Sequence, residues 1–180
     1  IKNNTMKKLI TIFTLAVSTF TFSQNSTPLK SNDIVINPVA LVLGAVNVEY
    51  ERIISENSGI GVTTSFLLDD YIIDDNNGFS ITPYYNYYFG KKRANGFYIG
   101  GYCSINSGDV EKSYYVSSQY GGYTMYTTEK ETNFGVGFKF GGKWVVKNDI
   151  VLEIGTGLGR NFGGENKVNT TGMLGIGKRF

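Results

Sequence analysis

Apolar and polar residues alternate with a period of two along much of this chain. The clearest segment is Phe79–Phe89, FSITPYYNYYF. Starting from Phe79 and Ile81, every second position of this segment carries an apolar or aromatic residue. Such alternation predicts a half-buried β-strand, because successive side chains point to opposite faces of a sheet. The same pattern predicts strands at Val46–Ile54, Gly59–Leu68, Phe97–Asn106, Asn133–Lys143, Ile150–Arg160 and Thr170–Phe180.

An eighth strand is expected at Asp33–Leu43, although this segment is almost continuously apolar and does not alternate. It is either one strand or a short strand followed by an apolar turn. Eight is an even number, as in single-chain bacterial membrane barrels. The pattern therefore predicts an all-β fold, an eight-stranded antiparallel up-and-down transmembrane β-barrel that follows a cleaved signal peptide.

The connections between the expected strands are mostly short on one side and long on the other. This arrangement is typical of outer-membrane barrels, which have tight periplasmic turns and longer extracellular loops. The short set is Ser55–Ser58, Gly90–Gly96 and Lys147–Asp149, and the long polar set is Asp69–Gly78, Ser107–Thr132 and Asn161–Asn169, with the short Gly44–Ala45 falling in the second set.

The first part of the chain has the pattern of a secretory signal peptide. Positively charged Met6–Lys8 precedes the apolar run Leu9–Phe22, and cleavage is expected near Ser23/Gln24. The apolar run is shorter than the roughly 20 residues of a membrane-spanning helix. We expect an N-terminal extension and signal peptide at 1–23, a short segment at 24–32 and a barrel domain at 33–180.

The two faces of the expected strands differ in size and polarity. The interior of an eight-stranded barrel is just wide enough for side chains, so the Gly-rich polar face fits inside and the Phe- and Tyr-rich face fits lipid. Charges of both signs then lie inside, where they can pair as a structural network. The predicted interior charges are Glu49, Glu51, Lys139, Lys143, Glu153 and Arg179, and the predicted membrane-interface aromatics are Phe89, Phe97, Trp144 and Phe180.

The composition excludes several kinds of chemistry. The formal net charge of +2 offers no strongly basic surface for nucleic acid. The chain has no His, which removes the usual catalytic triads and the commonest transition-metal ligand. We therefore expect no catalytic residue, no cofactor and no metal site. An acidic loop could suggest calcium, but it lacks the spacing of an EF-hand: Asp69, Asp70, Asp74 and Asp75.

Two short motifs resemble a known family. The stretch NPVALVLGAVNVEYER (Asn37–Arg52) and the closing GIGKRF (Gly175–Phe180) are similar to small outer-membrane β-barrel proteins of the Bacteroidetes group that carry a DUF3575-like domain. The resemblance implies an outer-membrane location and a barrel fold, without an established reaction. The last strand, which ends in Phe180, resembles the signal read by the barrel assembly machinery, so this machinery and outer-membrane lipid are the implied partners.

These observations favour a non-enzymatic outer-membrane barrel with a structural or surface-interaction role through its extracellular loops. The longest loop, Ser107–Thr132, is rich in Tyr and Ser, as binding loops are. It is either such a binding loop or a solvated hairpin that continues the strands. Two alternatives remain: a narrow pore or carrier of a small hydrophobic ligand, and a soluble secreted barrel that binds a ligand in an apolar interior.

Overall fold

The computed structural model describes residues 29–67, 78–118, 121–164 and 166–180. The chain divides into two units, Ile1–Lys30 and Ser31–Phe180, and nearly all of the described residues belong to the second. The predicted signal peptide and the acidic residues at 69–75 lie outside the described residues. Within the described ranges, no helix is both long and apolar enough to cross a membrane.

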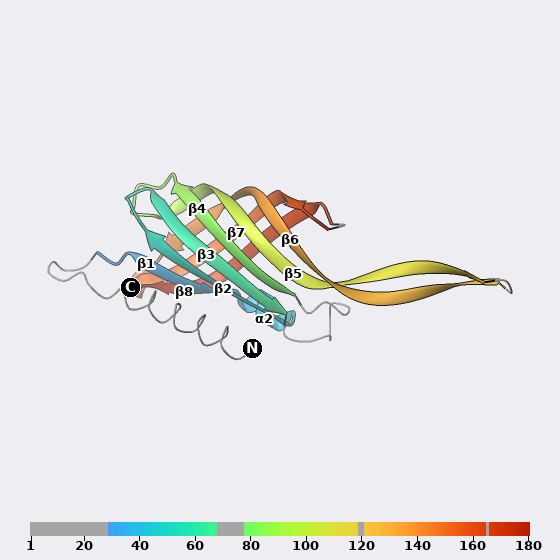
Figure 1. The fold of residues 1–180 in the computed structure, drawn as a ribbon. Coiled ribbons are helices and arrows are strands. Elements are labelled where there is room, and N and C mark those ends of the chain that lie inside the picture. The colour runs from blue at the N-terminus through green and yellow to red at the C-terminus, as the bar shows by residue number, and fades with distance from the viewer. Residues whose placement is uncertain (1–28, 68–77, 119–120, 165) are drawn as a thin grey trace, which may run out of the picture. The chain divides into compact units, whose positions relative to one another are not determined.

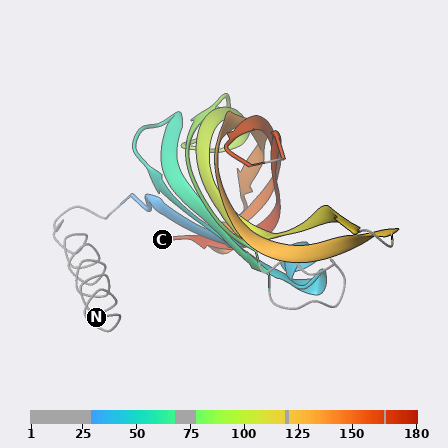
Figure 2. The ribbon, with the colours of Figure 1, turned by 45° about the vertical axis from the view of Figure 1, so that its right-hand side comes forward.

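The described residues form a closed antiparallel barrel of eight strands in sequence order (Figures 1 and 2). This confirms the predicted all-β up-and-down architecture. The strands are β1 (Asn32–Ile36), β2 (Ala45–Ile53), β3 (Ser58–Leu67), β4 (Phe79–Tyr88), β5 (Gly96–Ser118), β6 (Gly121–Val145), β7 (Ile150–Phe162) and β8 (Val168–Arg179), with a short helix α2 (Pro38–Val42) and a 3-10 turn η2 (Lys147–Asp149) between them.

The first strand is much shorter than its apolar sequence suggested. β1 ends at Ile36, and the Asn37 side chain then caps α2 by accepting a hydrogen bond from the Ala40 amide at 3.1 Å. Pro38 has no N–H for a strand ladder and is well suited to the first turn of a helix. The expected strand to Leu43 is therefore wrong in its second half, and the alternative of a short strand followed by an apolar turn is confirmed.

The barrel closes where β1 meets β8. The register runs from Asp33 opposite Arg179 to Ile36 opposite Ile176. Beyond the ladder, the Phe180 amide donates to the Asn32 carbonyl at 2.8 Å. The Phe180 carbonyl accepts hydrogen bonds from the amides of Ser31 and Asn32. The backbone of Phe180 thus takes part in closing the sheet, which removes the free edges that an open sheet would have.

Strands β5 and β6 continue well past their neighbours (Figure 1). β4 pairs with β5 only as far as Ser107, and β7 pairs with β6 only from Phe134 onward. Beyond these points, the pairing seen in the described part of the chain is that of β5 with β6. The segment expected as a long loop is therefore a hairpin that continues the strands. The loop expected at Asn161–Asn169 is also shorter than predicted, because β7 and β8 extend into it.

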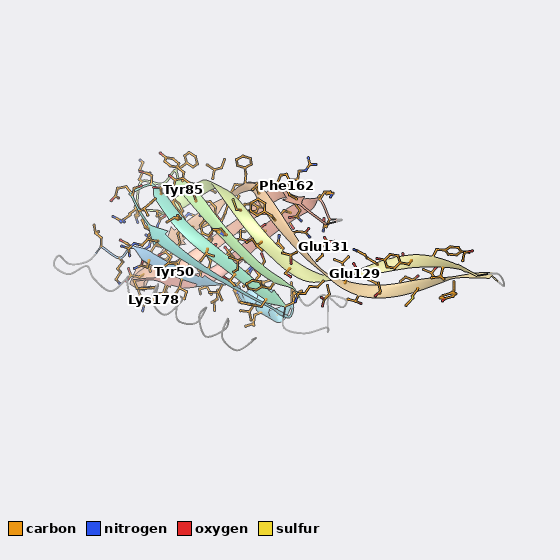
Figure 3. All side chains as sticks on the ribbon, in the orientation of Figure 1. Tyr50, Tyr85, Glu129, Glu131, Phe162 and Lys178 are labelled. Atoms are coloured by element: carbon orange, nitrogen blue, oxygen red, sulfur yellow. The ribbon has the colours of Figure 1, made fainter. Side chains whose placement is uncertain are left out.

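The two faces of the barrel have the polarity that the alternation predicted. On β4, Tyr84, Asn86 and Tyr88 are buried, whereas the side chains of Tyr85 and Tyr87 are about half exposed. Tyr85 and Phe162 lie on the outer surface (Figure 3). Because the apolar side chains point outward, the structure contradicts the apolar interior on which the alternative of a soluble ligand-binding barrel depended.

Glycine makes room for large tyrosines inside the barrel. A Cβ atom at Gly155 would lie 2.2 Å from the Tyr98 hydroxyl, and one at Gly137 would lie 2.6 Å from the Tyr102 ring. Both distances are too short for a side chain to be accommodated without movement. The Gly-rich faces of β6 and β7 therefore complement the tyrosines that β5 directs into the interior.

Candidate functional site

A cluster of paired charges surrounds Lys143 inside the barrel. Its ammonium nitrogen lies 2.9 Å from Glu153 Oε2 and 3.2 Å from Glu49 Oε1, and it also contacts Glu51 Oε2. Asp33 Oδ2 is 3.9 Å away. The side chains of Lys143, Glu51 and Asp33 have no exposed surface. Buried charges persist only when they are paired and hydrogen-bonded, so this cation is the electrostatic centre of the group.

Two further cations complete the group. Lys139 lies 3.3 Å from Glu49 Oε2, and its nitrogen is 3.6 Å from the centroid of the Tyr84 ring, a cation–π contact. Arg179 donates from Nε and Nη2 to the two oxygens of Asp33, each at 2.8 Å. Such a bidentate pair is stronger and more directional than a single hydrogen bond. We call Asp33, Glu49, Glu51, Lys139, Lys143, Glu153 and Arg179 the charge cluster.

The structure brings all six charged residues named from the sequence into this cluster. Asp33 also belongs to the cluster and was not predicted, because it lies in the one expected strand without alternation. In the structure Asp33 and Val35, two residues apart, are both buried.

Neutral hydroxyl groups complete the coordination of the carboxylates. Tyr88 donates to Glu51 at 2.7–2.8 Å, Tyr98 donates to Glu153 at 2.9 Å, and Thr63 donates to Glu49 at 3.0 Å.

The β4–β5 turn folds over this end of the barrel. Ala94 is fully buried, and its amide donates to the Glu56 carbonyl at 2.7 Å. Arg179 donates to the carbonyls of Arg93 and Ala94 at 2.8 and 3.0 Å. The turn and the charge cluster fill the lumen at this level. In the described part of the chain, no group of His, Cys, Asp or Glu is arranged to hold a metal ion.

The loop end of the interior is neutral instead of charged. Asn169 donates to Asn161 Oδ1 at 2.8 Å and to Ser104 Oγ at 3.0 Å, and it accepts from the Tyr102 hydroxyl at 2.8 Å. Asn106 in turn donates to Ser104 Oγ at 3.1 Å and accepts from Ser80 at 2.7 Å. These side chains form a hydrogen-bonded polar layer across several strands.

A cavity of about 770 Å³ opens beside this neutral layer, and we call it the vestibule. Its wall combines interior-facing residues of the barrel with the base of the β5–β6 hairpin. The polar side chains that line it belong to Ser65, Ser80, Asn106, Ser107, Asp109, Glu111, Glu131, Asn133, Asn161, Asn166, Asn169 and Thr170.

The four aromatic residues predicted at the membrane interface lie on the outer surface near the short turns. Phe89, Phe97 and Phe180 are all more than half exposed, and Trp144 is 37% exposed. Phe97 and Trp144 pack edge to face with ring centroids 5.7 Å apart. An outward aromatic group at one end of a barrel is the arrangement found at membrane interfaces.

The β5–β6 hairpin carries its charges near the barrel. Lys112 donates to Glu129 at 2.7 Å, and this hydrogen bond together with the Lys112 charge lowers the pKa of Glu129. Glu129 and Glu131 lie where the hairpin leaves the barrel (Figure 3). From Ser113 to Thr128 the sequence has no charged residue and no proline. We call Ser113–Thr128 the distal hairpin.

Taken together, the fold and the interior define a small closed up-and-down barrel with a polar inside and an apolar outside. A family model described as "Protein of unknown function (DUF3575)" matches residues 2–172, and the chain belongs to this family. The DUF3575-like resemblance seen in the sequence is thereby confirmed.

Two solved structures are similar to the chain. The N-terminal β-barrel domain of Pseudomonas aeruginosa OprF is 13% identical, with a TM-score of 0.44, over 84% of this chain and 98% of that one. The Yersinia pestis outer membrane protein Ail is 15% identical, with a TM-score of 0.44, over 84% of this chain and 99% of that one. No curated protein matches the sequence significantly.

Proposed function

We propose that the protein is a non-enzymatic barrel of a bacterial outer membrane, and that its β5–β6 hairpin binds a partner protein outside the membrane. The observation that carries the membrane location is the polarity of the barrel. Seven charged side chains are buried inside, while large apolar side chains cover the outside. A water-soluble barrel requires the opposite arrangement.

The outer apolar surface is extensive and is spread over the strands. Phe138 is 72% exposed, Leu158 is 60% exposed and Ile60 is 52% exposed, and these residues lie on β6, β7 and β3. Soluble monomers rarely expose contiguous apolar patches of more than a few hundred Å². The outward charges Arg52, Arg160 and Lys178 lie near strand ends, where the cost of a charge facing lipid is small.

The binding role rests on the edges of the hairpin. Among the described residues, Gly108–Ser118 of β5 and Gly121–Asn133 of β6 each have a single neighbouring strand, so each presents an unpaired edge. Proteins usually protect such edges with charges or proline, and the distal hairpin has neither. Its Tyr, Ser, Thr and Gly residues are of the types that form binding surfaces. An unpaired edge also favours the addition of an extended segment from another protein as a further strand.

The interior supports a structural role. The charge cluster fills the lumen beside the short turns, which disfavours the alternative of a narrow pore. No His is available for the usual acid–base chemistry. We also propose that a leader exports the chain, and that the barrel assembly machinery recognises the last strand with its aromatic Phe180.

The binding role can be tested by photocross-linking on intact cells. A photoreactive residue replaces Tyr115 or Tyr126, which are 73% and 65% exposed on the hairpin, or Phe138 on the barrel wall as a control. We expect discrete protein adducts from the two hairpin positions and no protein adduct from Phe138. A Thr124→Lys substitution should remove the hairpin adducts, because a lysine discourages edge pairing, whereas Thr132→Lys near the barrel should not.

The absence of protein adducts from both hairpin positions, in cells where the barrel is correctly assembled, would contradict the binding role. It would leave the membrane location standing, because that location rests on the barrel surface alone.

A further inference from the structure

The vestibule is a second feature that distinguishes the loop end of this barrel, and it does not depend on the hairpin edges. Its volume of about 770 Å³ lies within the range of ligand sites, roughly 300–1,000 Å³. Inward positions on β3, β4, β5, β6, β7 and β8 all contribute to its wall. A cavity built by convergent side chains from six strands is held by the barrel itself.

The polar floor of the vestibule is held in place before any ligand arrives. Asn169 is fixed by hydrogen bonds to Asn161, Ser104 and Tyr102, and Asn106 is fixed by Ser104 and Ser80. Side chains ordered in advance lose little conformational entropy on binding, which favours affinity.

One side-chain amide in the vestibule wall has an oxygen that accepts no hydrogen bond from the described residues. The Asn133 side chain donates from Nδ2 to Glu131 Oε1 at 2.9 Å. Its Oδ1 atom is buried and receives no hydrogen bond from the described residues. Buried polar atoms in proteins are nearly always paired. A ligand hydroxyl that displaces the atoms now covering this oxygen would donate a hydrogen bond to it.

The charges around the vestibule exclude one class of ligand. Asp109, Glu111 and Glu131 line it, and none of its described lining residues is Lys or Arg. An anionic ligand would therefore meet only like charge. The three carboxylates belong to the hairpin base, whereas the floor is made of neutral amides and hydroxyls. A cationic ligand would thus meet opposite charge only at the hairpin side of the wall and not at the floor.

We propose that the vestibule binds a neutral, hydroxyl-rich ligand, namely a saccharide of a few rings. Each sugar hydroxyl both donates and accepts, as do the carboxamides that dominate the floor. Leu67, Val110 and Val168 supply apolar contacts for the C–H faces of the rings. The saccharide can be free in solution or be the terminal part of a membrane glycolipid, because both present the same chemistry.

The test uses the full mature chain in phosphatidylcholine nanodiscs, with maltotriose, cellotriose and chitotriose as neutral probes. The readout is the NMR signal of the side-chain amides of Asn106, Asn133 and Asn169 during titration to tens of millimolar. We expect saturable shifts with at least one trisaccharide. Asn133→Ala should weaken binding about tenfold through loss of one hydrogen bond. Thr124→Ala, at an exposed hairpin position outside the vestibule wall, should leave binding unchanged.

Further arms separate the sources and the competing ligand classes. Glycolipid from the native outer membrane is added to the nanodiscs: displacement of the bound trisaccharide indicates a glycolipid ligand, and unchanged binding indicates a free saccharide, and both support the site. Spermidine and an acidic trisaccharide serve as charged comparisons. The proposal is overturned if no neutral probe gives saturable shifts, if only a charged probe does, or if Asn133→Ala binds as tightly as the wild type.

Discussion

At the scale of single residues, Lys143 joins side chains from three other strands. Its ammonium group on β6 contacts Glu49 and Glu51 of β2, Glu153 of β7 and, at 3.9 Å, Asp33 of β1. Four carboxylates around one cation would repel each other without it. Lys139 and Arg179 also offset the negative charge of the cluster, but each pairs with a single carboxylate. The cluster therefore depends on Lys143 more than on any other member.

This asymmetry predicts the effects of removing each lysine. Lys143→Met should lower the free energy of unfolding by about 3–5 kcal/mol, because it leaves several buried carboxylates without their cation. Lys139→Met should cost less, because it breaks one ion pair and two cation–π contacts. Urea unfolding of the barrel in lipid vesicles measures both.

A second change keeps this prediction decisive if the Lys143 variant folds poorly. Adding Glu51→Gln to Lys143→Met removes one of the buried carboxylates that have lost their cation, and this should recover part of the lost stability. Equal costs for the two lysine substitutions, or no recovery in the double variant, would contradict the account of the cluster.

The fit between glycine and tyrosine gives another prediction at this scale. Gly155→Ala should destabilise the barrel by about 1–3 kcal/mol, because its Cβ would lie 2.2 Å from the Tyr98 hydroxyl. Tyr98→Phe removes that hydroxyl and also the hydrogen bond to Glu153. In a double-mutant cycle, the combined cost should be smaller than the sum of the single costs. Strict additivity would show that the close approach is not the cause.

Much of the interior could be predicted from the sequence because side-chain parity in a strand is fixed. Each of the six predicted charges lies on the face that alternation assigned to it. Asp33 was not predicted as an interior charge, because β1 contains only one polar residue between Asn32 and Asn37 and shows no alternation. The contacts within the cluster could not be predicted, since they depend on the relative stagger of strands far apart in the sequence.

At the scale of elements, the part of the β5–β6 hairpin that extends past the neighbouring strands should contribute little to the stability of the barrel. β5 and β6 contain 23 and 25 residues, whereas a membrane strand needs about 9–11. Within the described ranges, the parts beyond Ser107 and Phe134 pair only with each other. From the sequence this segment could be either a binding loop or a hairpin, because Tyr, Ser and Thr suit both.

Replacing the distal hairpin, Ser113–Thr128, with a short Asn-Gly turn tests this independence. The barrel should unfold at the same urea concentration as the wild type, with a change of no more than about 0.5 kcal/mol, as for surface changes in general. The same variant should lose the photocross-linked partner. A large loss of barrel stability would show that the hairpin packs against the barrel, contrary to the observed strand pairing.

The end of β1 shows how local turn chemistry overrides apolar composition. Residues 38–43 are apolar and favour a strand by hydrophobicity, yet the Asn37-Pro38 dipeptide ends the strand and starts α2. This dipeptide is a known turn signal in sequences. The end of β1 could therefore have been predicted from this dipeptide, but the apolar residues that follow it suggested a longer strand.

At the scale of the whole molecule, the barrel has a polar inside and an apolar outside. A lysine placed on the outer wall should therefore have a cost that depends on its depth in the membrane. Phe138→Lys, on the barrel part of β6, should cost about 2–4 kcal/mol, and Phe89→Lys, beside a short turn, about 0–1 kcal/mol. Unfolding in lipid vesicles measures the difference, and equal costs at the two positions would argue against a lipid-facing wall.

Membrane fractionation combined with gel migration tests the central claim most directly. Cells that express the full chain are separated into periplasmic and outer-membrane fractions, and each sample is run on a detergent gel with and without boiling. A closed barrel embedded in lipid predicts recovery in the outer-membrane fraction and a change of migration after boiling. Recovery of folded protein from the periplasm in buffer alone, without detergent, would contradict the account.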